Sequence, residues 1–201
     1  MPIPKVFHRI WLGGKPMPQN YVLFGKSWLL HNPGWTMTTW EHRPSWLQNQ
    51  QLFDTAETYS EQSDIWRYEI LLKYGGVYVD TDYECRKNIG GLLDYFESLD
   101  PKLPIIATDA EKWQDDYPCY MNPALMGCSP GHPLMREVVD KLPAWALAHR
   151  AEGPCMSTGP GYITYNFQGR LFPVAQRVFN GEYAVHHLSG SWGKPWGKVK
   201  N

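Results

Sequence analysis

The sequence predicts an α/β fold in a single domain spanning residues 1–201. Three observations lead to this prediction. A chain of 201 residues suits one domain with a sizeable core. Residues 3–40 switch from strand-like to helix-like periodicity and back, as in a β–α–β unit. No internal repeat or low-complexity linker divides the chain.

The N-terminal elements follow from this switching. The segment IPKVFHRIWLGG at 3–14 predicts a buried strand that ends in a Gly-Gly turn. A helix is expected over 21–30, where HNPG stops it. Residues 35–40 alternate and are rich in Thr and Trp, which favours a strand.

The next elements lead to two aspartates. We expect a short helix within the mixed segment 41–60, and then a helix over 64–74 with Ser63 as its N-cap. Gly75 and Gly76 should end that helix. The strand at 77–79 follows, and its carboxyl end is where ligands bind in open α/β sheets.

The C-terminal half gives weaker signals. The longest one is an amphipathic helix over 132–150, expected to bend or split at Pro143. The other expected elements are a helix at 90–99, a strand at 103–110, a loop at 111–123, a strand at 124–130, a helix or strand within 157–170 and one strand in the tail at 183–200.

The composition excludes several classes of protein. The net charge of −1 gives no support for a basic nucleic-acid-binding surface. The four cysteines form no C-x-x-C pair, so no zinc cage is expected. No signal peptide is visible, and no apolar run approaches the roughly 20 residues of a membrane span. These features predict a cytoplasmic protein with reduced thiols that would meet a membrane only peripherally.

Asp80 and Asp82 carry the main functional signal. On an extended strand their side chains would point to opposite faces, but a turn at the strand end can bring both to one ion. Carboxylate oxygens suit Mg²⁺ or Mn²⁺, which complete their shells with water and phosphate oxygens. Because a bare D-x-D is also common in exposed acidic turns, its neighbours must decide between the two interpretations.

Three groups of neighbours favour a ligand site. Asp64 and Arg67 lie three residues apart on one helix face, where the alternative is a surface ion pair. In the tail, His187 could ligate a metal and Lys194 could hold a phosphate, with a solvated basic end as the alternative. Trp11 ends the first strand, where it could stack on a base or pack in the core.

The segment SDIWRYEILLKYGGVYVDTD at 63–82 resembles the sugar-nucleotide-binding segment of the DXD-containing glycosyltransferases, a family that includes yeast mannosyltransferases and bacterial capsule transferases. Clostridial glucosylating toxins are similar over the same stretch. The segments IPKVFHRIWLGG and HHLSGSWGKPW are similar to the opening and closing segments of that family, whereas residues 90–180 match weakly. The resemblance implies a GT-A type fold, a Rossmann-like α/β sheet that binds a nucleotide-sugar together with a divalent ion.

The resemblance also implies roles for single residues in donor binding. Trp11 would stack on the base of the nucleotide. Asp64 and Arg67 would reach the donor sugar or its phosphates, and Tyr78 and Asp80 would contact sugar and ribose. The other implied donor contacts are Asn122, Ser191, Trp192 and Lys194.

For the metal, the resemblance implies that Asp82 binds Mn²⁺ or Mg²⁺ directly, with Asp80 beside it and His187 completing the site. The implied catalytic residues are Asp82, Asp80, Arg67 and Lys194. The metal would stabilise the charge that develops on the leaving diphosphate. The resemblance suggests retention of configuration, and we expect a front-face reaction because no carboxylate stands out as a nucleophile.

The expected partners are a UDP-sugar or GDP-mannose donor and an acceptor hydroxyl on a glycan, a glycolipid or a protein. The near-neutral charge argues against a nucleic-acid acceptor. One alternative function is a haloacid-dehalogenase phosphatase, but Glu84 stands where that motif has Thr or Val. The other is a non-catalytic binder of glycans or nucleotide-sugars, which the 10 Trp and 12 Tyr residues would suit.

Overall fold

The structure is a computed structural model that describes residues 2–100, 102–108, 121–179 and 181–189. Its strands are β1 Val6–Ile10, β2 Thr36–Trp40, β3 Gly76–Val79, β4 Tyr83–Cys85, β5 Ile105–Thr108, β6 Met121–Cys128, β7 Phe172–Ala175 and β8 Ala184–His186. Its helices are α1 Gln19–His31, α2 Gln50–Asp54, α3 Tyr59–Tyr74, α4 Gly90–Leu99, α5 Pro133–Ala148, α6 Pro154–Ser157, α7 Pro160–Phe167 and α8 Gln176–Phe179, with a 3₁₀ turn at Arg150–Glu152.

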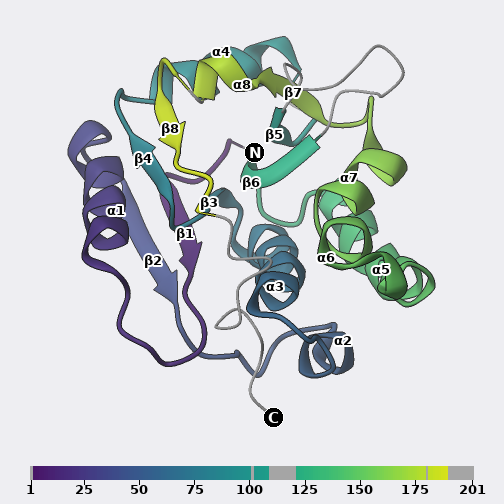
Figure 1. The fold of residues 1–201 in the computed structure, drawn as a ribbon. Helices are drawn as coiled ribbons and strands as arrows, with labels where there is room; N and C mark the ends of the chain where they lie inside the picture. The colour runs from purple at the N-terminus through teal and green to yellow at the C-terminus, as the bar shows by residue number, and fades with distance from the viewer. Residues whose placement is uncertain (1, 101, 109–120, 180, 190–201) are drawn as a thin grey trace.

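A six-stranded mixed sheet organises these elements in the order β2-β1-β3-β6-β5-β7 (Figure 1). Strands β2, β1 and β3 are parallel, so their carboxyl ends lie at one edge of the sheet. Strand β6 runs antiparallel to both β3 and β5. Strands β4 and β8 form a separate antiparallel pair. The expected α/β fold is confirmed.

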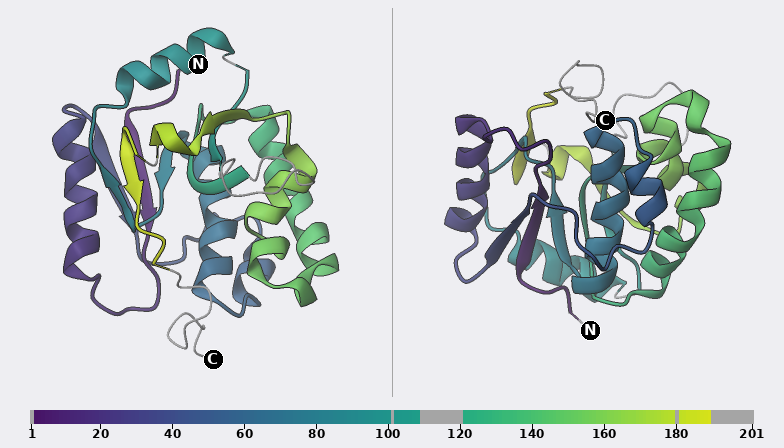
Figure 2. Two further views of the ribbon diagram at one scale, coloured as in Figure 1. Left: turned by 45° about the horizontal axis from the view of Figure 1, so that its top comes forward. Right: turned by 90° about the horizontal axis from the view of Figure 1, so that it is seen from below.

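Helices cover both faces of the sheet. Both views in Figure 2 place α1 on one side and helices α3, α5 and α7 on the other. Successive side chains of β3 point to opposite faces of the sheet. Val77 and Val79 pack in the cluster with Trp28 of α1, whereas Tyr78 packs in the cluster with α3, α5 and α7. Asp80 stands two residues after Tyr78, so the pleat directs both side chains towards α3. No described helix is long and apolar enough to cross a membrane.

The α3–β3 connection depends on two glycines. Gly75 caps α3 with a φ of 63°, and Gly76 follows with a φ of 87°. A Cβ on Gly76 would lie 2.6 Å from the carbonyl oxygen of Val6, so β1 and β3 can approach only because this side chain is missing. The predicted Gly-Gly break is therefore confirmed.

The structure corrects three details of the sequence predictions and decides one that was left open. Helix α3 begins at Tyr59, with Thr58 and Glu61 forming a capping box, so Ser63 lies inside the helix. Helix α5 continues through Pro143, so it is not split there. The last residues of the expected loop, 121–123, belong to β6. The undecided segment 157–170 is helical over Pro160–Phe167.

Candidate active site

A tight turn connects β3 to β4 and carries both aspartates. The amide of Asp80 donates to the carbonyl of Ala124 at 2.8 Å, which fixes the end of β3 on β6. The amide of Tyr83 then donates to the carbonyl of Asp80 at 3.1 Å, so residues 80–83 form a hydrogen-bonded β-turn. The turn breaks the strand pleat, and this lets Asp80 and Asp82 face the same space.

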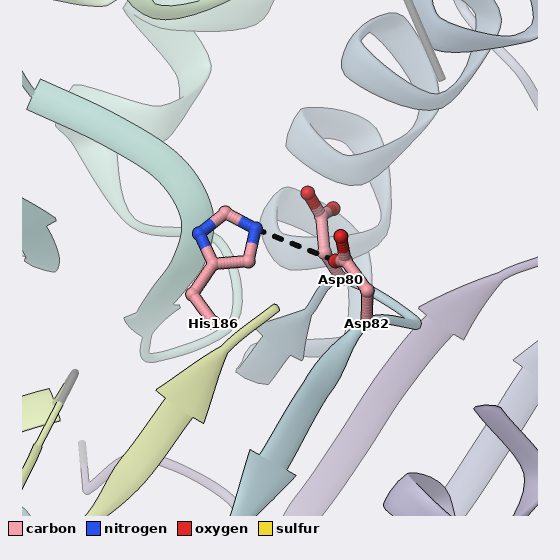
Figure 3. Close-up of side chains that lie close together, drawn as sticks. All are labelled: Asp80, Asp82 and His186. Atoms are coloured by element: carbon pink, nitrogen blue, oxygen red, sulfur yellow. Dashed lines mark ion pairs between the residues drawn. The ribbon is translucent and has the colours of Figure 1, made fainter. Parts of the chain in front are cut away.

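His186 joins the two aspartates (Figure 3). One ligand atom from each of Asp80, Asp82 and His186 lies within 4.8 Å of the others. The Nε2 atom of His186 is 3.4 Å from Oδ1 of Asp82. The imidazole stacks on the ring of Tyr83, its cross-strand neighbour on β4, with ring centroids 4.4 Å apart. The pairing of β4 with β8 therefore positions the histidine.

Ser189 holds the other oxygen of the Asp82 carboxylate. Its amide and its hydroxyl donate to Oδ2 of Asp82 at 2.9 Å and 2.7 Å. Burial opposes ionisation of Asp82, but the contacts from His186 and Ser189 outweigh it, so the pKa of Asp82 lies well below its usual value. Asp82 is thus an oriented anion.

Arg67 links the aspartate turn to helix α3. Its guanidinium Nη2 lies 2.8 Å from Oδ1 of Asp64 and 3.5 Å from Oδ1 of Asp80. The guanidinium also lies over the ring of Tyr78, 4.6 Å from its centroid, and the Tyr78 hydroxyl donates to Asp80 at 2.8 Å. The hydroxyl of Thr158 donates to Asp64 at 2.9 Å. These contacts fix Asp80 from the α3 side.

Negative charge is in excess at this site. Asp64 has no exposed surface, and burial raises its pKa to about 7 even though Arg67 and Thr158 favour the ionised form. Burial also raises the pKa of Asp80; Arg67 opposes this shift, and the neighbouring Asp82 adds to it. A divalent cation beside Asp80 and Asp82 would relieve the repulsion between the two carboxylates.

The possible ligand atoms of Asp80, Asp82 and His186 suit such a cation. Two carboxylate oxygens and one imidazole nitrogen converge from the turn and from β8. Carboxylates suit Mg²⁺ and Mn²⁺, and three protein ligands leave positions for water and phosphate oxygens. The side chain of Asp80 is 29% exposed, so ligands can reach the cluster from solvent.

The structure places the other predicted residues as follows. Trp11 is half-buried after β1, at the same sheet edge as Asp80, and its indole N–H donates to the carbonyl of Lys15. Asn122 lies on β6, where its side chain accepts the amide of Ala124. Ser191, Trp192 and Lys194 lie outside the described residues.

His187 is not with the aspartates. Its Nε2 lies 3.0 Å from Oε2 of Glu84, and its ring stacks on Phe24 of α1 with centroids 4.3 Å apart. His187 was expected to complete the metal site with the aspartates, but the structure places His186, and not His187, beside Asp80 and Asp82. Neighbouring residues on a strand face opposite sides, and the pairing of His186 with Tyr83 decides which histidine faces the turn.

Sequence reasoning missed three residues that hold this site together. They are His186, Ser189 and Thr158. The double histidine was a usable signal, because only one of two adjacent strand residues can face the turn. Thr158 gives no local signal, since its contact with Asp64 spans 94 residues.

Comparison with known proteins identifies the relatives of this chain. Residues 18–103 match the family described as "Glycosyltransferase sugar-binding region containing DXD motif". Inositol phosphoceramide mannosyltransferase 3 of Schizosaccharomyces pombe is 27% identical over 199 residues, a match that covers 92% of this chain and 49% of that protein. A glycosyltransferase of Acanthamoeba polyphaga mimivirus is 30% identical over 141 residues, covering 66% of this chain and 52% of that protein. The chain thus spans about half the length of these relatives.

Solved structures share the fold. The PaToxG glycosyltransferase superposes with a TM-score of 0.59 at 16% identity, covering 84% of this chain and 71% of that one. Mouse xyloside xylosyltransferase 1 superposes with a TM-score of 0.55 at 12% identity, covering 87% and 86%. These likenesses confirm the expected GT-A type fold. The sequence match over residues 18–103 and the shared fold together confirm that the chain resembles the glycosyltransferases whose sugar-binding region contains the DXD motif.

Proposed function

We propose that this chain transfers a sugar from a nucleotide-sugar donor to an acceptor hydroxyl, with Mn²⁺ or Mg²⁺ as its cofactor. The observation that carries the proposal is the convergence of Asp80, Asp82 and His186 at the carboxyl edge of the sheet. In open α/β sheets this edge is where ligands bind. The proposal treats residues 1–201 as one catalytic unit.

Each side chain of the cluster has a separate task. Asp82 and His186 would hold the cation, with Asp80 as a further or water-mediated ligand. The cation would supply Lewis-acid stabilisation of the leaving diphosphate. Arg67 and Tyr78 keep the Asp80 carboxylate in place through the ion pair and the hydrogen bond described above.

The remaining donor contacts stay proposals from the resemblance. Trp11 would stack on the base, and its half-buried position at the shared sheet edge supports this role. Asp64 would act through Arg67, since it has no exposed surface of its own. The other proposed contacts are Asn122 for the sugar and Ser191, Trp192 and Lys194 for the diphosphate.

We propose retention of configuration by a front-face reaction, in which the leaving diphosphate oxygen assists the acceptor hydroxyl. The complete burial of Asp64 supports this choice, because it removes one carboxylate from the candidates for a covalent nucleophile. A glycosyl-enzyme adduct seen by mass spectrometry would contradict it. Acceptors to test are hydroxyls on glycans, glycolipids and proteins.

Donor binding gives the most direct test. The chain is mixed with Mn²⁺ and a panel of UDP-sugars and GDP-mannose, and unfolding is followed by thermal shift, because a ligand of the native state raises the Tm. GDP-mannose comes first, since the S. pombe relative is named as a mannosyltransferase. We expect one donor to raise the Tm and to be hydrolysed slowly, both only with the cation.

Three variants sharpen this test. Asp82→Asn and His186→Ala should abolish the cation-dependent shift and donor turnover while the protein stays folded. His187→Ala is the matched control and should retain both, because His187 contacts Glu84 and Phe24 instead. Full activity of Asp82→Asn would refute the proposal, and glycan binding that needs no metal, without donor turnover, would indicate the non-catalytic binder.

A further inference from the structure

Arg9 is a buried cation that the reaction described above does not use. It lies on β1 with 3% of its surface exposed. Among the described residues, no carboxylate comes within 4.0 Å of its guanidinium. Burial lowers its pKa to about 10, with Tyr78 and Asp82 acting in the opposite direction. A buried charge without an ionic partner is costly, so its contacts call for an explanation.

The partners of Arg9 are two backbone carbonyls and the thioether sulfurs of Met17 and Met37, which are weaker acceptors. Its Nη2 donates to the carbonyl of Tyr21 on α1 at 2.7 Å and to the carbonyl of Thr81 at 3.2 Å. Thr81 is the residue between the two aspartates, so its carbonyl belongs to the central peptide of the turn. Arg9 therefore ties that peptide to the first turn of α1.

The orientation of this peptide matters for Asp82. Type I and type II turns differ by a flip of the central peptide, and type II needs a positive φ at the third residue, here Asp82. Leu188 is the one non-glycine residue with a positive φ in the described part of the chain. The turn thus has the orientation in which the Thr81 carbonyl reaches Arg9, and a flip would re-aim the Asp82 carboxylate.

Gly25 of α1 makes room for the guanidinium. A Cβ at this position would lie 1.8 Å from Nη1 and 3.0 Å from Cζ of Arg9. Glycine inside a helix is less favourable than alanine. The guanidinium that lies against Gly25 explains why the helix has a glycine here. A Gly25→Ala substitution therefore displaces Arg9 without changing its charge.

We propose that Arg9 is a positioning residue that locks the central peptide of the Asp80–Tyr83 turn and thereby aims Asp82 at the bound cation. The second half of this inference rests on the proposed function, whereas the first half concerns the turn alone. Arg9 itself touches neither the donor nor the metal. Residues that orient a metal ligand typically change metal affinity by about 10–100-fold when they are replaced.

Two measurements separate the halves of the inference. Amide hydrogen exchange without metal reports the turn, because the Tyr83 amide donates to the Asp80 carbonyl. We expect Arg9→Gln and Gly25→Ala to speed exchange at this amide at least tenfold, with little change in the amides of β6. Unchanged exchange in both folded variants would overturn the inference.

The second measurement is Mn²⁺ affinity, read from the electron paramagnetic resonance signal of the free ion. Both variants should weaken binding at least tenfold. A role of Arg9 through charge alone predicts the opposite pattern, with tighter binding in Arg9→Gln and no change in Gly25→Ala, and that pattern would overturn the inference. If the wild-type chain bound no Mn²⁺, the proposed function would fail, and the exchange data would still decide whether Arg9 locks the turn.

Stability provides the control. In the wild type, Gly25→Ala should destabilise the protein, because the new methyl group collides with the guanidinium. In the Arg9→Gln background that space is free, so the same change should be neutral or stabilising. Gly91→Ala on α4 is the matched variant, since a Cβ there meets nothing within 4 Å, and it should leave Mn²⁺ affinity unchanged. Equal effects of Gly25→Ala in the two backgrounds would show that it does not act through Arg9.

Discussion

His8 gives the stability of this protein a pH dependence that can be worked out from its contacts. The imidazole is 3% exposed on β1. Its Nε2 lies 3.0 Å from the carbonyl of Gly75, and its Nδ1 lies 3.2 Å from the indole N–H of Trp40. A carbonyl only accepts and an indole N–H only donates, so these partners assign the neutral tautomer with its proton on Nε2. A second proton, on Nδ1, would point at the indole N–H of Trp40 and remove this hydrogen bond.

The magnitude follows from the pKa of His8, which burial lowers from 6.5 to about 4, with the Gly75 contact opposing. The unfolded chain then binds this proton more readily than the folded one, so stability is lost as the pH falls below 6.5. With these two pKa values, the contribution of His8 is about 2 kcal/mol smaller at pH 5 than at pH 7. The contribution of Asp64 to stability changes with pH in the opposite direction. Burial raises its pKa to about 7, so the folded state binds the proton before the unfolded chain as the pH falls.

A difference measurement isolates His8 from Asp64. Urea unfolding of the wild type and of His8→Gln is followed between pH 5 and pH 8. The stability of the wild type relative to the variant should fall by about 2 kcal/mol from pH 7 to pH 5. His42→Gln, at an exposed position, should leave the pH profile unchanged. A flat difference curve for His8→Gln would refute the assignment of a buried neutral imidazole.

Three further variants test how the site is supported, each by urea unfolding at pH 7. Thr58→Ala should destabilise the protein by about 1 kcal/mol, because it removes the N-cap of α3. Its control, Ser63→Ala, should change the stability by less than about 0.5 kcal/mol. Equal effects of the two variants would contradict the capping box. Gly76→Ala should destabilise the protein clearly more than its control Gly34→Ala. Both glycines have φ near +85°, but only a Cβ at Gly76 would meet the carbonyl of Val6. A similar loss of stability in both variants would show that β1 and β3 can shift apart. Arg67→Met should cost about 1–3 kcal/mol, because it removes the buried partner of Asp64 and Asp80. The cost of an unpaired charge is limited, since Asp64 has a pKa of about 7 and can stay protonated, and an unchanged stability would contradict a role of Arg67 in holding the two aspartates.

The parts of the site that could be predicted lie close together in the sequence. Asp80 and Asp82 follow a short apolar strand, and the two glycines before that strand mark the end of a helix. Asp64 and Arg67 share a face of that helix because they are three residues apart, and the structure pairs them at 2.8 Å. Local periodicity and turn chemistry were sufficient for these features.

One local feature was still predicted wrongly. Helix α3 is capped by Thr58 rather than Ser63, and the sequence could not decide between them because many polar residues near a helix start can serve as caps.

Other parts of the site depend on contacts between distant segments. The contact between Thr158 and Asp64 has no local signature, because it forms only when Thr158, the residue after α6, lies against α3. The contact of Arg9 with Thr81 likewise requires β1 and β3 to be neighbours.

By itself, the sequence determined the α/β alternation, the strand that ends in two aspartates and the helix face that bears Asp64 and Arg67, because each of these is set by residue spacing within one element. The tertiary structure decided which histidine meets the aspartates. The register of β4 against β8 pairs His186 with Tyr83 and turns His187 towards Phe24. A strand alternates its side chains between two faces, so a sequence can show that one of two adjacent histidines will face the site, but the pairing partner selects which one.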